Sequence, residues 1–144
     1  MAMNLKKTYG YNKKMAQEGV WVDIGDGASI KVAKLGTIAY QNTVQRHARK
    51  YQALTRVGRL NAKEMVELTA GALADCILLD WKNILDENDN PLPYNRENAY
   101  KLLVEYEEFR NLVESYANDT DLFRDNVIDI ESDSKNSLIT SSGT

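Results

Sequence analysis

Residues 61–82 read NAKEMVELTAGALADCILLDWK, and the fold that the sequence predicts is built around this stretch. Its apolar residues recur at helical spacing on two adjacent stripes, which together cover most of a helix circumference. One stripe holds Met65, Leu68, Ala72, Cys76 and Leu79, and the other holds Val66, Ala70, Leu73, Ile77 and Trp81. The spacing of Asn61 and Glu64 is typical of a capping box at a helix start. We therefore expect one central, mostly buried helix that runs to Lys82.

A helix is also predicted on each side of this central one. Residues 37–57 place large or apolar side chains at spacings of four and three, with basic side chains off that stripe. After the central helix, residues 86–93 (DENDNPLP) contain both prolines of the chain and predict a loop. The apolar residues of segment 96–118 predict a third long helix, with a bend near Glu107.

Strand signals are confined to the N-terminal part of the chain. Residues 20–24 and 28–33 alternate apolar and polar side chains, and Gly25-Asp26-Gly27 between them supplies turn residues. This pattern predicts a β-hairpin. The expected fold is therefore mainly α, a small helical domain of three to four helices with a short N-terminal β-hairpin.

The domain organisation follows from the same patterns. Residues 1–18 carry four lysines without a sustained apolar period, so we expect a flexible basic arm. Residues 19–130 are expected to form a single helical domain, which ends in a short acidic helix or strand over 121–130. The polar, serine-rich segment 131–144 is expected to be a disordered tail.

Composition excludes several classes of protein. The chain has 144 residues, a formal net charge of -3, one cysteine and one histidine, so a disulfide scaffold and a zinc module are both excluded. No apolar run reaches the ~20 residues of a membrane span, and the first residues lack the pattern of a signal peptide. We expect a cytoplasmic protein that does not bind membranes.

Charge is segregated along the chain. Segment 31–63 contains eight Lys and Arg residues and no acid, whereas segment 105–133 contains ten acids and two bases. The predicted partner-binding residues are basic and lie on the first long helix: Arg46, Arg49, Lys50 and Arg56. They are expected to meet an acidic protein partner or the chain's own acidic C-terminal helix. Nucleic-acid binding ranks lower because the chain is acidic overall and shows no recognition module.

The residues that could carry chemistry each have a simpler explanation. His47 has no neighbouring nucleophile to activate, and Cys76 lies on an apolar stripe, where thiols act as small hydrophobic side chains. Asp86, Asn88 and Asn90 resemble the start of a calcium-binding loop, but Pro91 occupies the position that requires glycine. We therefore predict no catalytic residue, no cofactor and no metal site, and a protein that is not an enzyme.

One stretch resembles a known family. The residues that carry the resemblance are Leu79-x-Trp81-x-x-Ile84-x-Asp86, then Pro93-Tyr94-Asn95-x-Glu97-Asn98-Ala99-x-x-Leu102-Leu103, then Leu112-Val113-x-x-x-Ala117 and Phe123. This pattern, over about residues 60–125, resembles the tail assembly chaperones of long-tailed, siphovirus-type bacteriophages. The motif positions carried over are Trp81, Tyr94, Glu97, Asn98, Leu102 and Leu103, which are expected to stabilise a helix–loop–helix.

The resemblance implies a non-catalytic chaperone, made in the host cell cytoplasm, that keeps the tape-measure protein soluble during tail morphogenesis. It also implies a homo-oligomer, and a longer form of the chain made by ribosomal frameshifting as a further partner. A protein with amphipathic helices is suited to shielding the apolar faces of a long helical client. Two alternatives stay open, a structural phage tail or virion component and a nucleic-acid-binding regulator that uses segment 31–63.

Overall fold

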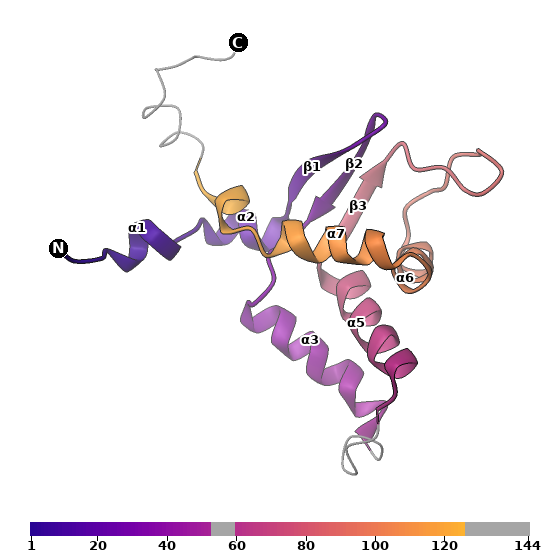
Figure 1. The fold of residues 1–144 in the computed structure, drawn as a ribbon, viewed down its shortest axis with the longest axis horizontal. Coiled ribbons are helices and arrows are strands. Elements are labelled where there is room, and N and C mark those ends of the chain that lie inside the picture. The colour runs from indigo at the N-terminus through magenta and orange to yellow at the C-terminus, as the bar shows by residue number, and fades with distance from the viewer. Residues whose placement is uncertain (53–59, 126–144) are drawn as a thin grey trace.

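The computed structural model describes residues 1–52 and 60–125. The described part of the chain is a mixed α and β structure, in which the strands lie between helices in the sequence (Figure 1). Its elements, in chain order, are α1 (Leu5–Tyr9), α2 (Lys13–Glu18), β1 (Val20–Gly25), β2 (Ala28–Val32), α3 (Ile38–Arg49), α5 (Ala62–Cys76), β3 (Leu78–Lys82), α6 (Arg96–Glu105), α7 (Glu107–Ala117) and the 3-10 helix η1 (Thr120–Phe123).

The strands form a three-stranded antiparallel sheet in the order β1-β2-β3. The hairpin of β1 and β2 forms where the alternation predicted it, with Val22 opposite Ile30. The third strand overturns the expectation of a mainly helical domain with a short N-terminal hairpin, because β3 pairs along the other edge of β2, with Ile30 opposite Trp81. In Figure 1 the strands rise on one side of α7, while α3 and α5 extend as a pair on the other.

The central helix is therefore shorter than predicted. Helix α5 begins at the Asn61–Glu64 capping box, as expected, but ends at Cys76, and Leu78–Lys82 continue as a strand. A short, mostly apolar run such as residues 77–81 fits both a helical and a strand pattern. The elements that pack against it therefore decide which of the two structures it adopts. Here β2 has apolar side chains on its buried face and an edge that needs a partner, and Lys31 lies opposite Asp80 across the new ladder.

The core lies between the sheet and the helices. Ile30 and Val32 of the sheet, Leu73 of α5, Leu103 of α6 and Val113 of α7 are all fully buried. Full burial of each such side chain stabilises the fold by about 1.5–3 kcal/mol relative to exposure. Small residues at 70, 72 and 74 let neighbouring helices approach α5 on several sides, and α3 and α6 both pack against it.

The predicted third helix is two helices. Helix α6 ends at Glu105 and α7 begins at Glu107, because Tyr106 between them is extended, with φ −109° and ψ 99°. The Nη1 of Arg110 donates a hydrogen bond of 2.8 Å to the carbonyl oxygen of Leu103, which satisfies one of the last carbonyls of α6. The bend expected near Glu107 is thus a break one residue earlier.

Residues 1–18, expected as a flexible arm, include the helices α1 and α2. Ala16 of α2 is buried in the core, and the amide of Asn12 donates a hydrogen bond of 2.7 Å to the carbonyl of Phe123. Helix α1, in contrast, contains no buried residue. The expectations for Arg56, for the residues after 125 and for the tail 131–144 lie outside the described residues.

Candidate functional site

Trp81, in β3, and Tyr94, just before α6, form a corner between the sheet and the loop 83–95, which we call the Trp81 corner. Trp81, at 6% exposure, donates a hydrogen bond from Nε1 to the carbonyl of Leu92 at 2.8 Å. Its ring meets that of Tyr94 edge to face, with the ring centroids 5.1 Å apart. The Tyr94 hydroxyl donates to the carbonyl of Leu78 at 2.6 Å, and burial, then Asp80 and Asp75, raise the pKa of that hydroxyl. Both aromatic residues therefore fasten the loop 83–95 to the sheet.

The remaining motif residues start and orient α6. The side chain of Asn95 caps α6 by accepting from the amide of Asn98, and the Nδ2 of Asn98 donates to the carbonyl of Pro93 at 2.9 Å. Glu97 is exposed in the first turn, where a negative charge is favourable to the helix. Of the adjacent leucines, Leu103 is fully buried in the core and Leu102 is half-buried.

The acidic loop folds on itself. The Oδ1 of Asp86 accepts from the amides of Asn88 and Asn90 at 2.8 and 3.0 Å, and Leu85 pairs with Pro91 in an isolated bridge. The Asp86 carboxylate therefore holds the turn through its Oδ1 atom. Within residues 1–52 and 60–125, no group of three or more His, Cys, Asp or Glu side chains could hold a metal ion.

An open groove of about 440 Å³ lies between this loop and the helices α6 and α7. Its apolar lining comes from distant parts of the chain: Ile24, Ile84, Leu92, Leu102 and Phe109. Two further lining residues, Leu85 and Tyr106, are exposed although they are large and apolar. The charged residues of the lining are three acids, Asp86, Glu87 and Glu105, and one base, Lys101. We call this feature the α6 groove.

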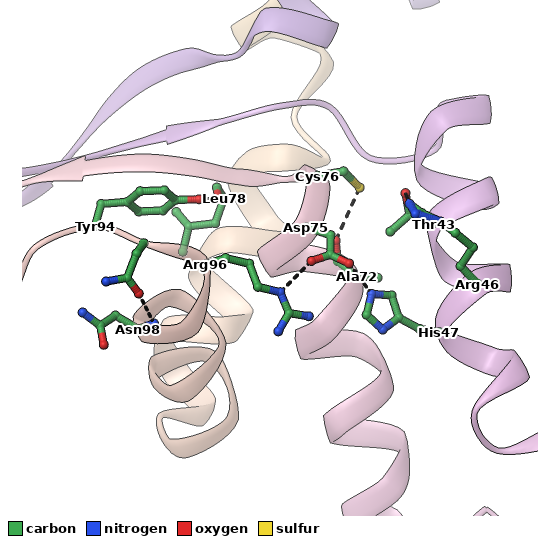
Figure 2. A network of polar contacts seen from close by, with 11 residues as sticks. Thr43, Arg46, His47, Ala72, Asp75, Cys76, Leu78, Tyr94, Arg96 and Asn98 are labelled. Carbon is green, nitrogen blue, oxygen red and sulfur yellow. Dashed lines mark hydrogen bonds and ion pairs between the residues drawn. The ribbon is translucent and has the colours of Figure 1, made fainter.

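A second cluster joins α3, α5 and α6 (Figure 2). Asp75 of α5 lies between His47 of α3 and Arg96 of α6, with its two carboxylate oxygens 2.5 Å from the His47 Nε2 and 2.6 Å from the Arg96 Nε. Burial would raise the pKa of Asp75, but the hydrogen bonds from Arg96 and His47 outweigh it and hold that pKa below its ordinary value. The charged carboxylate therefore links three helices.

A glycine allows α3 to approach α5 at this cluster. A Cβ at Gly71 would lie 2.8 Å from both the Cε1 and the Nδ1 of His47, closer than such atoms normally come. Gly71 is buried within α5, so the missing side chain makes room for the imidazole. His47 is half-buried, and its ring contacts Asp75.

The single cysteine lies beside this cluster and shows no sign of a reactive thiolate. Cys76 is half-buried, and its thiol donates to the carbonyl of Ala72 at 3.4 Å. Burial raises the pKa of the thiol, and this outweighs the opposing effect of the Thr43 hydroxyl shown beside it in Figure 2. A raised pKa keeps the sulfur protonated and weakly nucleophilic.

Three of the four predicted basic residues lie in the described part of the chain, Arg46 and Arg49 on α3 and Lys50 just after it. Arg46 donates from Nη2 to the Thr43 hydroxyl at 2.9 Å, while Arg49 and Lys50 are exposed. In the described part of the chain, no salt bridge joins segment 31–52 to the acids of segment 105–125. The acids that accept hydrogen bonds from this region lie on α5: Asp75 contacts His47 of α3, and Glu67 accepts a hydrogen bond from Tyr51, just after α3. Glu114 of α7 also acts on α3, since its charge helps to raise the pKa of Tyr40 after the larger effect of burial.

Sequence reasoning located the motif residues but missed both the groove and the Asp75 cluster. The groove depends on Ile24 at the end of β1 meeting α6 and α7, which no local pattern reports. Asp75 did carry a usable signal, since it lies on the narrow polar face of an otherwise apolar helix. A charged residue in that position needs a partner from a neighbouring helix.

No helix of the described residues is long and apolar enough to span a bilayer. No curated protein matches the chain, and no solved structure matches it either. The model of one protein family, described as YdaY prophage protein, matches residues 35–132, which is more than half of the chain. The match supports the phage origin that the resemblance implied. The chain, from α3 through η1, belongs to the YdaY prophage protein family.

Proposed function

We propose that this prophage protein is a tail assembly chaperone that binds the tape-measure protein and keeps it soluble in the host cytoplasm. The proposal joins the family's phage origin to the resemblance of residues 60–125, and it treats the protein as a binding module without catalysis. The observation that carries it is the α6 groove, an open apolar surface built directly beside the motif residues.

The groove has the features of a helix-binding site. An amphipathic helix binds a groove through apolar residues at positions i, i+3 or i+4 and i+7. Leu85 and Tyr106 stand exposed at the groove, so a client helix would bury apolar surface that now faces solvent. Since most of the charged lining residues are acids, the client segment that fits has basic residues beside its apolar face.

The anchoring of the groove explains how binding can be reversible without unfolding the protein. The Trp81 and Tyr94 hydrogen bonds fix the loop 83–95 from beneath, so the groove is formed before a client arrives. A preformed site avoids the cost of ordering a loop on binding. A modest apolar groove then gives a moderate affinity. The chaperone can therefore be released when the tail tube assembles around the tape-measure protein.

The test is co-expression of this chain with the tape-measure protein of the same prophage, followed by pull-down and a solubility assay. A groove variant, Leu85→Gln with Tyr106→Gln, removes exposed apolar side chains from the groove. A control variant, Ile38→Gln with Met65→Gln, makes the same kind of change at exposed residues elsewhere.

We expect a soluble complex with the wild type and the control, and an insoluble client with the groove variant. A client that is equally soluble alone and never co-purifies would refute the proposal. Recovery of the protein in purified particles would instead favour a structural virion component.

A further inference from the structure

We propose that the α6 groove also binds the N-terminal segment, residues 1–9, of a second copy of this chain. The proposal concerns self-association and goes beyond client binding, so it holds whatever the client is. It rests on two surfaces of the same chain that complement each other in apolar character and in charge.

The first surface is the N-terminal segment. Met3, Leu5 and Tyr9 are 62%, 64% and 61% exposed, and no residue of α1 is buried. Leu5 and Tyr9 are four residues apart in α1, so they lie on one face of the helix. Lys6 and Lys7 give the segment two positive charges, and it contains no acid. The segment thus carries a short basic helix whose apolar side chains are left mostly exposed by the described residues of its own chain.

The second surface is the α6 groove. It offers exposed Leu85 and Tyr106 to apolar side chains, and its acids Asp86, Glu87 and Glu105 exceed the single base Lys101. The two faces match in the way that favours association, apolar against apolar with a basic side facing an acidic rim.

The fold places these surfaces at opposite ends of one molecule. The chain just after the segment is held at η1 and the residues that follow it. The Asn12 amide donates to the Phe123 carbonyl, and the Asn12 side chain donates to Asp125 at 3.0 Å. Arg124 adds hydrogen bonds to the carbonyls of Gly10 and Thr8. In Figure 1, α1 points away from the sheet on one side, while α6 lies on the other side, beyond α7.

A segment held in this way meets the groove of a neighbouring copy more readily than its own. Contact between two different surfaces of identical chains is heterologous, so it builds either a closed ring or an open chain. A client helix that enters the same groove would displace the segment, which couples client binding to disassembly of the oligomer.

Sedimentation velocity and light scattering on the purified full chain, without any client, test the proposal over a range of concentrations. The segment variant is Leu5→Asp with Tyr9→Asp, and the groove variant and the control are those defined above. We expect concentration-dependent oligomers for the wild type and the control. For the segment variant and the groove variant, we expect an apparent dissociation constant at least about tenfold higher.

Mixing the segment variant with the groove variant gives the sharpest result. The first keeps an intact groove and the second keeps an intact segment, so together they can form one productive contact and no more. We expect a one-to-one heterodimer that does not grow.

Exchanging the charges of the segment and the groove distinguishes a variant that has lost the contact between copies from one that has failed to fold. Lys6→Glu with Lys7→Glu should weaken self-association, and Glu87→Lys with Glu105→Lys in the same chain should restore it. A wild type that stays monomeric at all concentrations, or oligomers that none of these variants weakens, would overturn the proposal. A client that still fails to co-purify would bear only on the chaperone function.

Discussion

Two regions around α5 are held together by different physical means. At the Trp81 corner, a buried Trp81 ring meets a half-buried Tyr94 ring, and the polar atom of each donates to a main-chain carbonyl. At the contact between α3 and α5, which we call the seam, Gly71 leaves room for the His47 ring and the charged carboxylate of Asp75 contacts it. The first region should therefore dominate stability, and the second should respond to pH and to small changes in side-chain volume.

The largest effect is expected at Trp81. Trp81→Ala removes a core side chain and its hydrogen bond to Leu92, so we expect a loss of about 3–5 kcal/mol in the free energy of unfolding. Trp21→Ala is the matched control, because Trp21 is 41% exposed and its ring contacts only the ammonium group of Lys82 among the cations of the described residues. Urea unfolding followed by circular dichroism measures both. Equal losses for the two variants would show that the corner is not the main anchor.

The next largest effect on the free energy of unfolding is expected at Gly71, and its sign should depend on whether His47 is present. Gly71→Ala should destabilise the protein by about 1–2 kcal/mol, since the new methyl group displaces the His47 ring and overpacks the seam. In a His47→Ala background the same change should stabilise it by up to about 1 kcal/mol, because alanine is the better helix former. The double-mutant cycle is measured by urea unfolding, and additive effects would contradict the close contact.

A smaller, pH-dependent effect is expected at Asp75. Its pKa is lowered in the folded protein from the ordinary value of 3.8, so its contribution is complete above that value and is lost as pH falls through the lower folded pKa. Asp75→Asn should cost about 1 kcal/mol at neutral pH and should flatten the stability profile in the acid range. Glu18→Gln, at an exposed position, is the control. Parallel profiles for wild type and Asp75→Asn would contradict the role of Asp75.

The smallest effect is expected on the exposed basic side of α3. Arg49→Ala with Lys50→Ala should change the free energy of unfolding by less than about 0.5 kcal/mol, because both residues are exposed. Thermal unfolding measures this. A loss as large as that of Asp75→Asn would show that these charges belong to the seam, leaving them less available for a partner.

The sequence predicted local structure well where one pattern had one interpretation. The turn Gly25-Asp26-Gly27 between alternating strands predicted the hairpin, and the Asn61–Glu64 capping box predicted the start of α5. It failed at residues 77–82, where an apolar run suits a helix or a strand. The choice is made by the free edge of β2, a feature of the assembled sheet that no local spacing reports.

The candidate site was predictable only in part for the same reason. The resemblance pointed to Trp81, Tyr94 and Asn98, whose contacts lie within a short stretch of chain. The groove instead joins Ile24 to Leu102 and Phe109, and the Asp75 cluster joins three helices. Contacts between distant segments leave little trace in a single sequence.

The most direct test of the proposed client site is hydrogen–deuterium exchange on this chain, with and without the tape-measure protein of the same prophage, at a concentration where the chain alone is monomeric. The proposed function predicts that binding slows exchange in residues 84–92 and 98–109, which border the α6 groove, while amides of α3 exchange as before. Slower exchange confined to α3, with none at the groove, would contradict it and would move the partner to the basic helix.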